Sequence, residues 1–171
     1  MTEIELLVGD EQDGVSSMGF VDFPAIEVDG IYFNKNKFNL TFGKSTGEEG
    51  LFVAPAMIAD KRIYRYNPET NEEYYVWFSP ETIKQVSQDF MINNYNFNNK
   101  EQHEKPIKDI HLVYSWLVYN DKDPIITHFG FKNIPVGSWI CVYKINNPDI
   151  REKIKNGVIR GLSIEGYFAE K

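Results

Sequence analysis

Two side chains of this sequence could together form an activated nucleophile, namely the imidazole of His103 and the hydroxyl of Ser163. A serine hydroxyl attacks a carbonyl only when an adjacent base accepts its proton, and histidine is the side chain best suited to that task near neutral pH. His103 stands in the polar segment EQHEKP, just before a predicted strand, and catalytic residues often lie on loops that a rigid scaffold positions. Taken alone, His103 fits a solvated surface histidine better than a catalytic base, and spacing in a sequence proves no triad.

Ser163 lies in the segment from Arg160 to Tyr167, where apolar and polar residues alternate as in a strand. Successive side chains of a strand point to opposite faces, so Glu165 is expected on the face of Ser163, together with Gly161 and Tyr167. A glycine beside the serine leaves room for a peptide backbone to approach. The spacing differs from the GxSxG pattern of α/β-hydrolases, and Ser163 taken alone fits an ordinary strand serine.

The other histidines and the single cysteine are further candidates. His111 follows His103 by eight residues on a predicted strand, and His128 lies in a predicted strand or turn with no assigned role. Cys141 stands in an apolar run, where a free cysteine is usually a small core residue rather than a nucleophile. Three histidines and one cysteine show no metal-ligand spacing, so no metal or organic cofactor is expected.

Composition narrows the class of protein. The 171 residues suit one domain with a substantial core, and an aromatic content of 15% favours β-rich structure. A net charge of −7 makes nucleic acid an unexpected partner. One cysteine forms no internal disulfide, which favours a reducing compartment. We expect neither a signal peptide nor a membrane span, because the N-terminus lacks a basic start and no apolar run approaches spanning length.

Hydrophobic periodicity and capping residues predict a mainly β protein with short helices (α+β), arranged as a β-barrel or a strongly curved sheet decorated by helices. Strands or extended segments are predicted over residues 3–8, 19–27, 31–33, 38–42, 51–58, 73–78, 107–119, 125–131, 137–145 and 158–169. One helix is expected after Ser79, which precedes Pro80, and a second over residues 148–155 after Asn147. Gly157 is expected to end the second helix.

Eight segments resemble, in order along the chain, the prohead (capsid maturation) proteases of tailed phages, in the branch related to the serine protease of defective Bacillus prophages. They are GFVDFPAIE (19–27), AMIADKRIY (56–64), YYVWFSPETI (74–83), FMINNYNFN (90–98), His103, SWLV (115–118), PVGSW (135–139) and GLSIEG (161–166). The segment over residues 56–64 resembles the family's "PDxxIYR" motif. His103 stands in the place of the family's catalytic histidine, and the last segment resembles its nucleophile strand.

The resemblance implies a serine endopeptidase with a fold like that of the herpesvirus assembly protease, a β-barrel surrounded by helices. It implies Ser163 as nucleophile and His103 as general base. The implied substrates are the phage scaffolding protein and the major capsid protein, inside the prohead within the host bacterial cytoplasm. Neither nucleic acid nor a membrane is an expected partner, and a homodimer is expected by analogy with relatives. A non-catalytic phage structural protein that keeps the protease fold is the alternative.

The third member of the catalytic group is left open at this stage. The family often has an acidic residue at the position of Tyr114, and the herpesvirus relatives draw their third member from beyond the serine, where only eight residues follow here. Glu165, His111 and Asp22 are the candidates. The whole chain, 1–171, is predicted to be one prohead protease domain, and a C-terminal continuation found in relatives is expected to be absent.

Overall fold

The computed structural model describes residues 1–27, 30–33 and 50–171. Within these residues the chain forms three four-stranded sheets and short helices, so the prediction of a mainly β, α+β fold is confirmed. None of the three sheets closes on itself within the described residues, so the predicted barrel is not confirmed. The predicted strand over residues 38–42 lies outside the described part of the chain.

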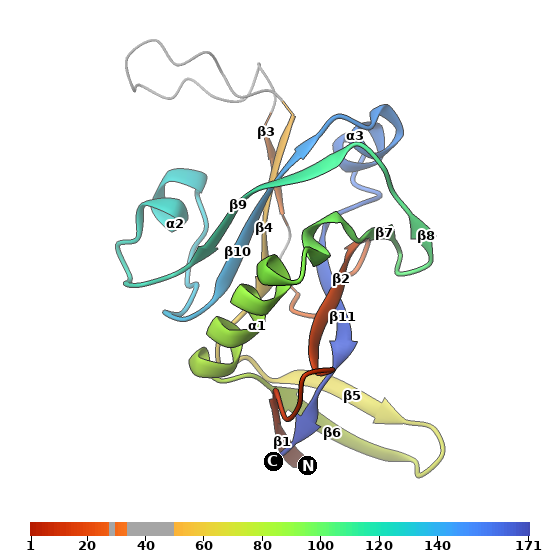
Figure 1. Cartoon of the computed structure of the whole chain (residues 1–171), viewed down its shortest axis with the longest axis vertical. Helices are drawn as coiled ribbons and strands as arrows, with labels where there is room; N and C mark the ends of the chain where they lie inside the picture. The colour runs from red at the N-terminus through yellow and green to blue at the C-terminus, as the bar shows by residue number, and fades with distance from the viewer. Residues whose placement is uncertain (28–29, 34–49) are drawn as a thin grey trace.

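The sheet that matters most for the site has the order β11-β2-β7-β8. Its strands are β11 (Gly161–Tyr167), β2 (Gly14–Val21), β7 (Asn99–Glu101) and β8 (Lys105–Pro106). β2 is antiparallel to β11 and parallel to β7, so this sheet joins segments from both ends and the middle of the chain. In Figure 1, β2 and β11 run side by side at the centre, with β7 and β8 at their flank.

The second sheet forms the opposite wall of the core, in the order β3-β4-β10-β9. Its strands are β3 (Ile31–Phe33), β4 (Leu51–Met57), β10 (Trp139–Ile145) and β9 (Ile110–Leu117). The ring of Phe20 on β2 packs edge-on against Tyr143 of β10, with 5.0 Å between the ring centroids. Phe20 is fully buried, and burial of such a side chain contributes about 1.5–3 kcal/mol, which fixes the inner face of β2.

The third sheet has the order β12-β1-β6-β5 and lies at the end of the molecule where both termini meet (Figure 1). Its strands are β1 (Thr2–Leu7), β5 (Ile63–Asn67), β6 (Glu72–Trp77) and β12 (Ala169–Glu170). β5 and β6 form a hairpin that extends away from the body of the molecule. The predicted strands over residues 3–8 and 73–78 correspond to β1 and β6.

Two helices begin where their capping residues predict. In α1 (Pro80–Ile92) the Ser79 hydroxyl accepts a hydrogen bond from the Thr82 N–H. In α3 (Pro148–Lys155) the Asn147 side chain accepts one from the Ile150 N–H. Each cap satisfies a backbone donor that the first turn leaves without a partner. Between α1 and β7 lies the short 3-10 helix η1 (Tyr95–Phe97).

The predicted strand over residues 125–131 is wrong, because α2 (Pro124–Phe129) forms there and contains His128. Pro124 takes the first helical position, where its fixed φ favours the helix and its missing N–H costs nothing. The Asp123 carboxylate holds this helix start by accepting hydrogen bonds from the Trp116 indole and the Tyr119 N–H. The tendency of Pro124 to start a helix therefore outweighed the strand preference of the short β-branched run that follows it. Within the described residues, no helix has both the length and the apolar character that crossing a membrane requires.

Candidate active site

His103 occupies a tight turn between β7 and β8. Gln102 and His103 both adopt positive φ, 51° and 62°, and the Glu104 N–H donates to the Glu101 carbonyl across 3.0 Å. Two successive residues with positive φ and this hydrogen bond define a type I′ turn, which usually contains glycine or asparagine. A left-handed histidine costs conformational energy, and such residues persist where the surrounding structure holds them.

The turn is held to the main sheet by its neighbour Gln102. The Gln102 N–H donates to the Phe20 carbonyl on β2, and its side-chain amide bonds both to the Asp22 carboxylate (3.0 Å) and to the Asp22 N–H (3.2 Å). Glu101 adds an ion pair with Lys153 at 2.7 Å. Asp22, a candidate for the third catalytic group, therefore holds the turn rather than the imidazole.

The imidazole of His103 fills the space that a side chain at Gly19 would take. A Cβ placed on Gly19 would lie 2.6, 2.8 and 3.0 Å from the ring atoms Cε1, Nδ1 and Nε2. Gly19 is directly opposite Ser163 in the antiparallel pair of β2 and β11. Side chains of such opposite residues share one face, with about 5 Å between their Cβ atoms. The ring of His103 and the side chain of Ser163 therefore lie on one face of the sheet.

Glu165 completes the group on the same face. Its Oε2 lies 3.3 Å from His103 Nδ1, and its Oε1 lies 2.6 Å from the Lys100 ammonium. When Nδ1 carries the proton, it donates to Glu165, and Nε2 is left with a lone pair that can accept a proton from a nearby hydroxyl. Within the described residues, no hydrogen bond joins His103 to Ser163, and such bonds often tighten only when substrate is bound.

The charge of Glu165 is stabilised by its neighbours. The hydrogen bond from Lys100 is the largest cause that holds the pKa of Glu165 below its ordinary value of 4.5, and His103 acts in the same direction. Partial burial opposes this shift because it disfavours a charged carboxylate. Glu165 is therefore ionised near neutral pH and can stabilise a positive charge on the imidazole.

The polar side chains on this face of the sheet are partly exposed to solvent. The side chains of Lys100, His103 and Glu165 are 31%, 35% and 39% exposed, and Ser163 is half-buried. The opposite face of the same strands carries Leu162 and Phe20, which are fully buried. These four polar side chains therefore lie on the face of the sheet that points away from the core. The register shifts between Glu165 and Gly166, where β2 contains one extra residue, so beyond Glu165 the strand β11 has a different alignment with β2.

Other candidate residues lie elsewhere. His111 is on β9 of the second sheet, directly opposite Lys144 of β10, and Tyr114 is exposed on the same strand. His128 contacts the ring of Phe129 within α2. Cys141 is fully buried, and burial raises the pKa of its thiol well above the ordinary value, which suppresses the reactive thiolate. The prediction that Cys141 is a core residue is confirmed.

Two residues of the group were not predicted, Gly19 and Lys100. Gly19 matters because it lacks a side chain, and Lys100 lies opposite Gly19 on β7. Lys100 lies only three residues before His103, but its ion pair with Glu165 joins residues 65 positions apart. No local pattern contains that pairing, since it depends on the register of three strands.

Comparison with protein families gives one match. A family model described as "Putative phage serine protease XkdF" matches residues 59–171, more than half of the chain. The matched range includes Lys100, His103, Ser163 and Glu165, whereas Gly19 lies before it. The searches of curated proteins and of solved structures returned no match.

Proposed function

Since the chain belongs to this phage serine protease family, we propose that it is a serine endopeptidase with Ser163 as nucleophile and His103 as general base. Glu165 is proposed to orient His103 as the third member of the group. One observation carries this assignment. The imidazole occupies the side-chain space of Gly19, directly opposite Ser163, while its Nδ1 faces the Glu165 carboxylate.

The reaction follows from these positions. Nε2 of His103 accepts the proton of the Ser163 hydroxyl as its oxygen bonds to the scissile carbonyl carbon. The imidazolium then donates that proton to the departing amine, and the C–N bond breaks to leave an acyl-enzyme. Water, deprotonated by the same imidazole, hydrolyses the ester and restores the hydroxyl. Glu165 stabilises the imidazolium in both steps and keeps the proton of the resting imidazole on Nδ1.

The biological substrates are proposed from the family resemblance. A phage protease with its active groups on an open sheet face suits extended segments of protein substrates. We assign it to the prohead interior in the host cytoplasm, where it would cleave the scaffolding protein and the major capsid protein. The prohead branch, the relation to the herpesvirus assembly protease and the barrel form of the fold belong to the same proposal.

The nucleophile is tested by Ser163→Ala. Cleavage of purified scaffolding protein should fall by about 10³-fold or more, and labelling by a fluorophosphonate probe should disappear. Ser87→Ala, in α1, is the matched control and should keep both activities. Unchanged cleavage by Ser163→Ala would remove the assignment. If the unaltered protein were neither labelled nor active on scaffolding protein, the non-catalytic structural alternative would be favoured.

The role of Glu165 is tested by Glu165→Gln. We expect kcat to fall on the order of 10³-fold, because the imidazole loses the carboxylate that selects its tautomer and stabilises its charged form. KM should stay the same, since Glu165 contacts His103 rather than substrate. A variant with unchanged kcat and an unchanged melting temperature would show that Glu165 is a bystander.

A further inference from the structure

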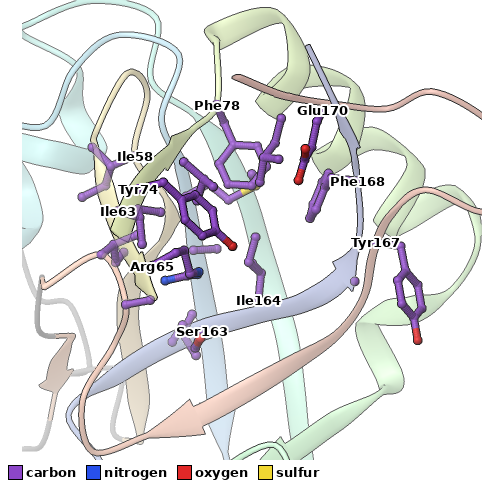
Figure 2. Close-up of a pocket in the computed structure, with 18 residues that line it drawn as sticks. Ile58, Ile63, Arg65, Tyr74, Phe78, Ser163, Ile164, Tyr167, Phe168 and Glu170 are labelled. Atoms are coloured by element: carbon purple, nitrogen blue, oxygen red, sulfur yellow. The ribbon is translucent and has the colours of Figure 1, made fainter. Parts of the chain in front are cut away.

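A cavity of about 320 Å³ lies beside Ser163, and its walls come mostly from β4, β5, β6 and β11. Its apolar walls include Ile58, Ile63, Val76, Phe78, Ile164 and Phe168. Figure 2 shows the cavity above β11, with Ser163 at its lower boundary. The volume suits one or two amino-acid side chains rather than a folded domain. It therefore lies where a residue close to a cleaved bond would be placed.

The edge of β11 beside this cavity has unpaired backbone groups. On β2, the Met18 N–H and the Phe20 carbonyl bond to residues of the β7 segment, so these two residues turn their backbone groups away from β11. In an antiparallel pair, two opposite residues either exchange backbone hydrogen bonds or form none with each other. A β11 residue of the second kind directs its N–H and C=O away from β2, to the far edge of β11. Those residues are Ile164 and Leu162. Within the described residues, β11 pairs only with β2, so Leu162 and Ile164 have no strand partner on this edge; just before β11, the Arg160 carbonyl accepts a hydrogen bond from the Gly30 N–H.

Two polar groups converge at the Ser163 end of the cavity. Arg65 on β5 and Tyr74 on β6 are directly opposite each other in the hairpin, so their side chains share a face. Figure 2 shows the Arg65 guanidinium and the Tyr74 hydroxyl directed toward Ile164 and Ser163. Arg65 donates to the Tyr64 carbonyl, and within the described residues no carboxylate forms an ion pair with it. Glu170, the acidic residue of the lining, lies at the other end beside Phe168.

We propose that the substrate pairs as an added strand with the open edge of β11 and places an acidic side chain, close to the cleaved bond, in this cavity. Its carboxylate would bond to Arg65 and Tyr74, and its methylene groups would contact the apolar walls. Backbone pairing supplies affinity without regard to sequence, and the cavity supplies selection. Arg65 is thus the specificity-determining residue. This inference rests on the proposed protease function and names the substrate class of that site.

The test uses the full-length Ser163→Ala protein and fluorescent peptides of scaffolding protein sequence in which one position at a time is Glu, Gln or Lys. At one position within two residues of the cleaved bond, Glu should bind at least about tenfold tighter than Gln, as expected for a hydrogen-bonded charged group. Arg65→Gln should reduce this ratio to about one, and Arg65→Glu should favour Lys. Arg62→Gln is the matched control and should keep the ratio, since Arg62 is paired with Glu3.

Strand pairing has its own readout. N-methylation of peptide amides should weaken binding at alternate positions only, because alternate amides of an added strand face β11. Equal effects at all positions would overturn the pairing, and a Glu-to-Gln ratio near one, or one unchanged in Arg65→Gln, would overturn the acidic subsite. Failure of the protease function is recognised separately. The unaltered protein would then bind these peptides selectively but neither cleave them nor react with the fluorophosphonate.

Discussion

Two sheets of this protein each contain a histidine and a serine, but in the described residues only one of them brings its histidine and serine to the same face beside a carboxylate. On the sheet of β2, β7 and β11, the residue opposite Ser163 is Gly19, and the imidazole of His103 enters the free space. On the sheet of β9 and β10, His111 lies opposite the cation Lys144. The hydroxyl of Ser115 accepts a hydrogen bond from the indole of Trp139. Whether a histidine can act together with a serine therefore depends on which residues the strand register places opposite them, and not on residue type alone.

The two sheets also differ in what they expose. The outer face beside Ser163 carries charged groups that pair with one another, Lys100 with Glu165 and Glu165 with His103. The outer face of β9 carries Tyr114 and Trp116, which are 54% and 41% exposed. The histidine of this strand, His111, lies opposite Lys144, and no ion pair or hydrogen bond with a carboxylate is found for it in the described part of the chain. The first sheet suits acyl transfer, and the second has no equivalent machinery among its described residues.

Replacing each of the two histidines separately is the strongest test of this difference between the sheets. His103→Asn should lower cleavage by about 10³-fold, within the usual contribution of a general base, whereas His111→Asn should stay within about twofold of the parent. Asparagine tolerates the left-handed conformation of the turn, so His103→Asn should keep its melting temperature. Cleavage rates and thermal unfolding check both variants. Equal losses in the two variants would show that the sheets do not differ in this way.

Filling the space at Gly19 should have the next largest effect. In Gly19→Ala the new methyl group would meet the ring atoms of His103 at 2.6–3.0 Å, so the imidazole must move. A displacement of this size should lower kcat about 10²-fold while the strand still folds. In the His103→Asn background, Gly19→Ala should add no further loss, because the ring that it displaces is gone. Additive losses would place the effect of Gly19 elsewhere.

The smallest expected effect is on the free energy of unfolding, through the ion pair of Lys100 and Glu165. The pKa of Glu165 is lowered in the folded protein, so its pairing with Lys100 stabilises the fold fully above the ordinary value of 4.5. That contribution is lost as the pH falls through the lowered value. Lys100→Met should reduce the free energy of unfolding at pH 7 by at most about 1 kcal/mol, because the pair is partly exposed.

Urea unfolding of the parent and of Lys100→Met at pH 7, 5 and 3 measures this difference, which should shrink at the lowest pH. Lys105→Met, an exposed lysine on β8, is the control and should show no such pH dependence. A difference that is constant from pH 7 to 3 would mean that Lys100 acts through packing rather than through the Glu165 carboxylate.

Local signals predicted those parts of the fold that depend on neighbouring residues. Ser79 and Asn147 are capping residues whose effect lies within one turn, and both helices begin there. α2 was mistaken for a strand because a short β-branched run was weighted above Pro124. β7 and β8 were not predicted, since strands of three and two residues are too short to show alternation. The order of predicted strands suggested a barrel or a strongly curved sheet, the resemblance implied a barrel, and the described strands do not confirm closure.

The residue pattern alone predicted that Ser163 and Glu165 share one face of a strand, because side chains alternate with a period of two. It also placed His103 in a polar turn. Tertiary structure decided that the turn closes over Gly19, and that Gly19 and Lys100 lie in one row with Ser163. The physical reason is register. A slip of one residue between β2 and β11 would turn the buried Phe20 outward, so burial of the core selects the alignment that places Gly19 opposite Ser163, with the Glu165 carboxylate beside His103.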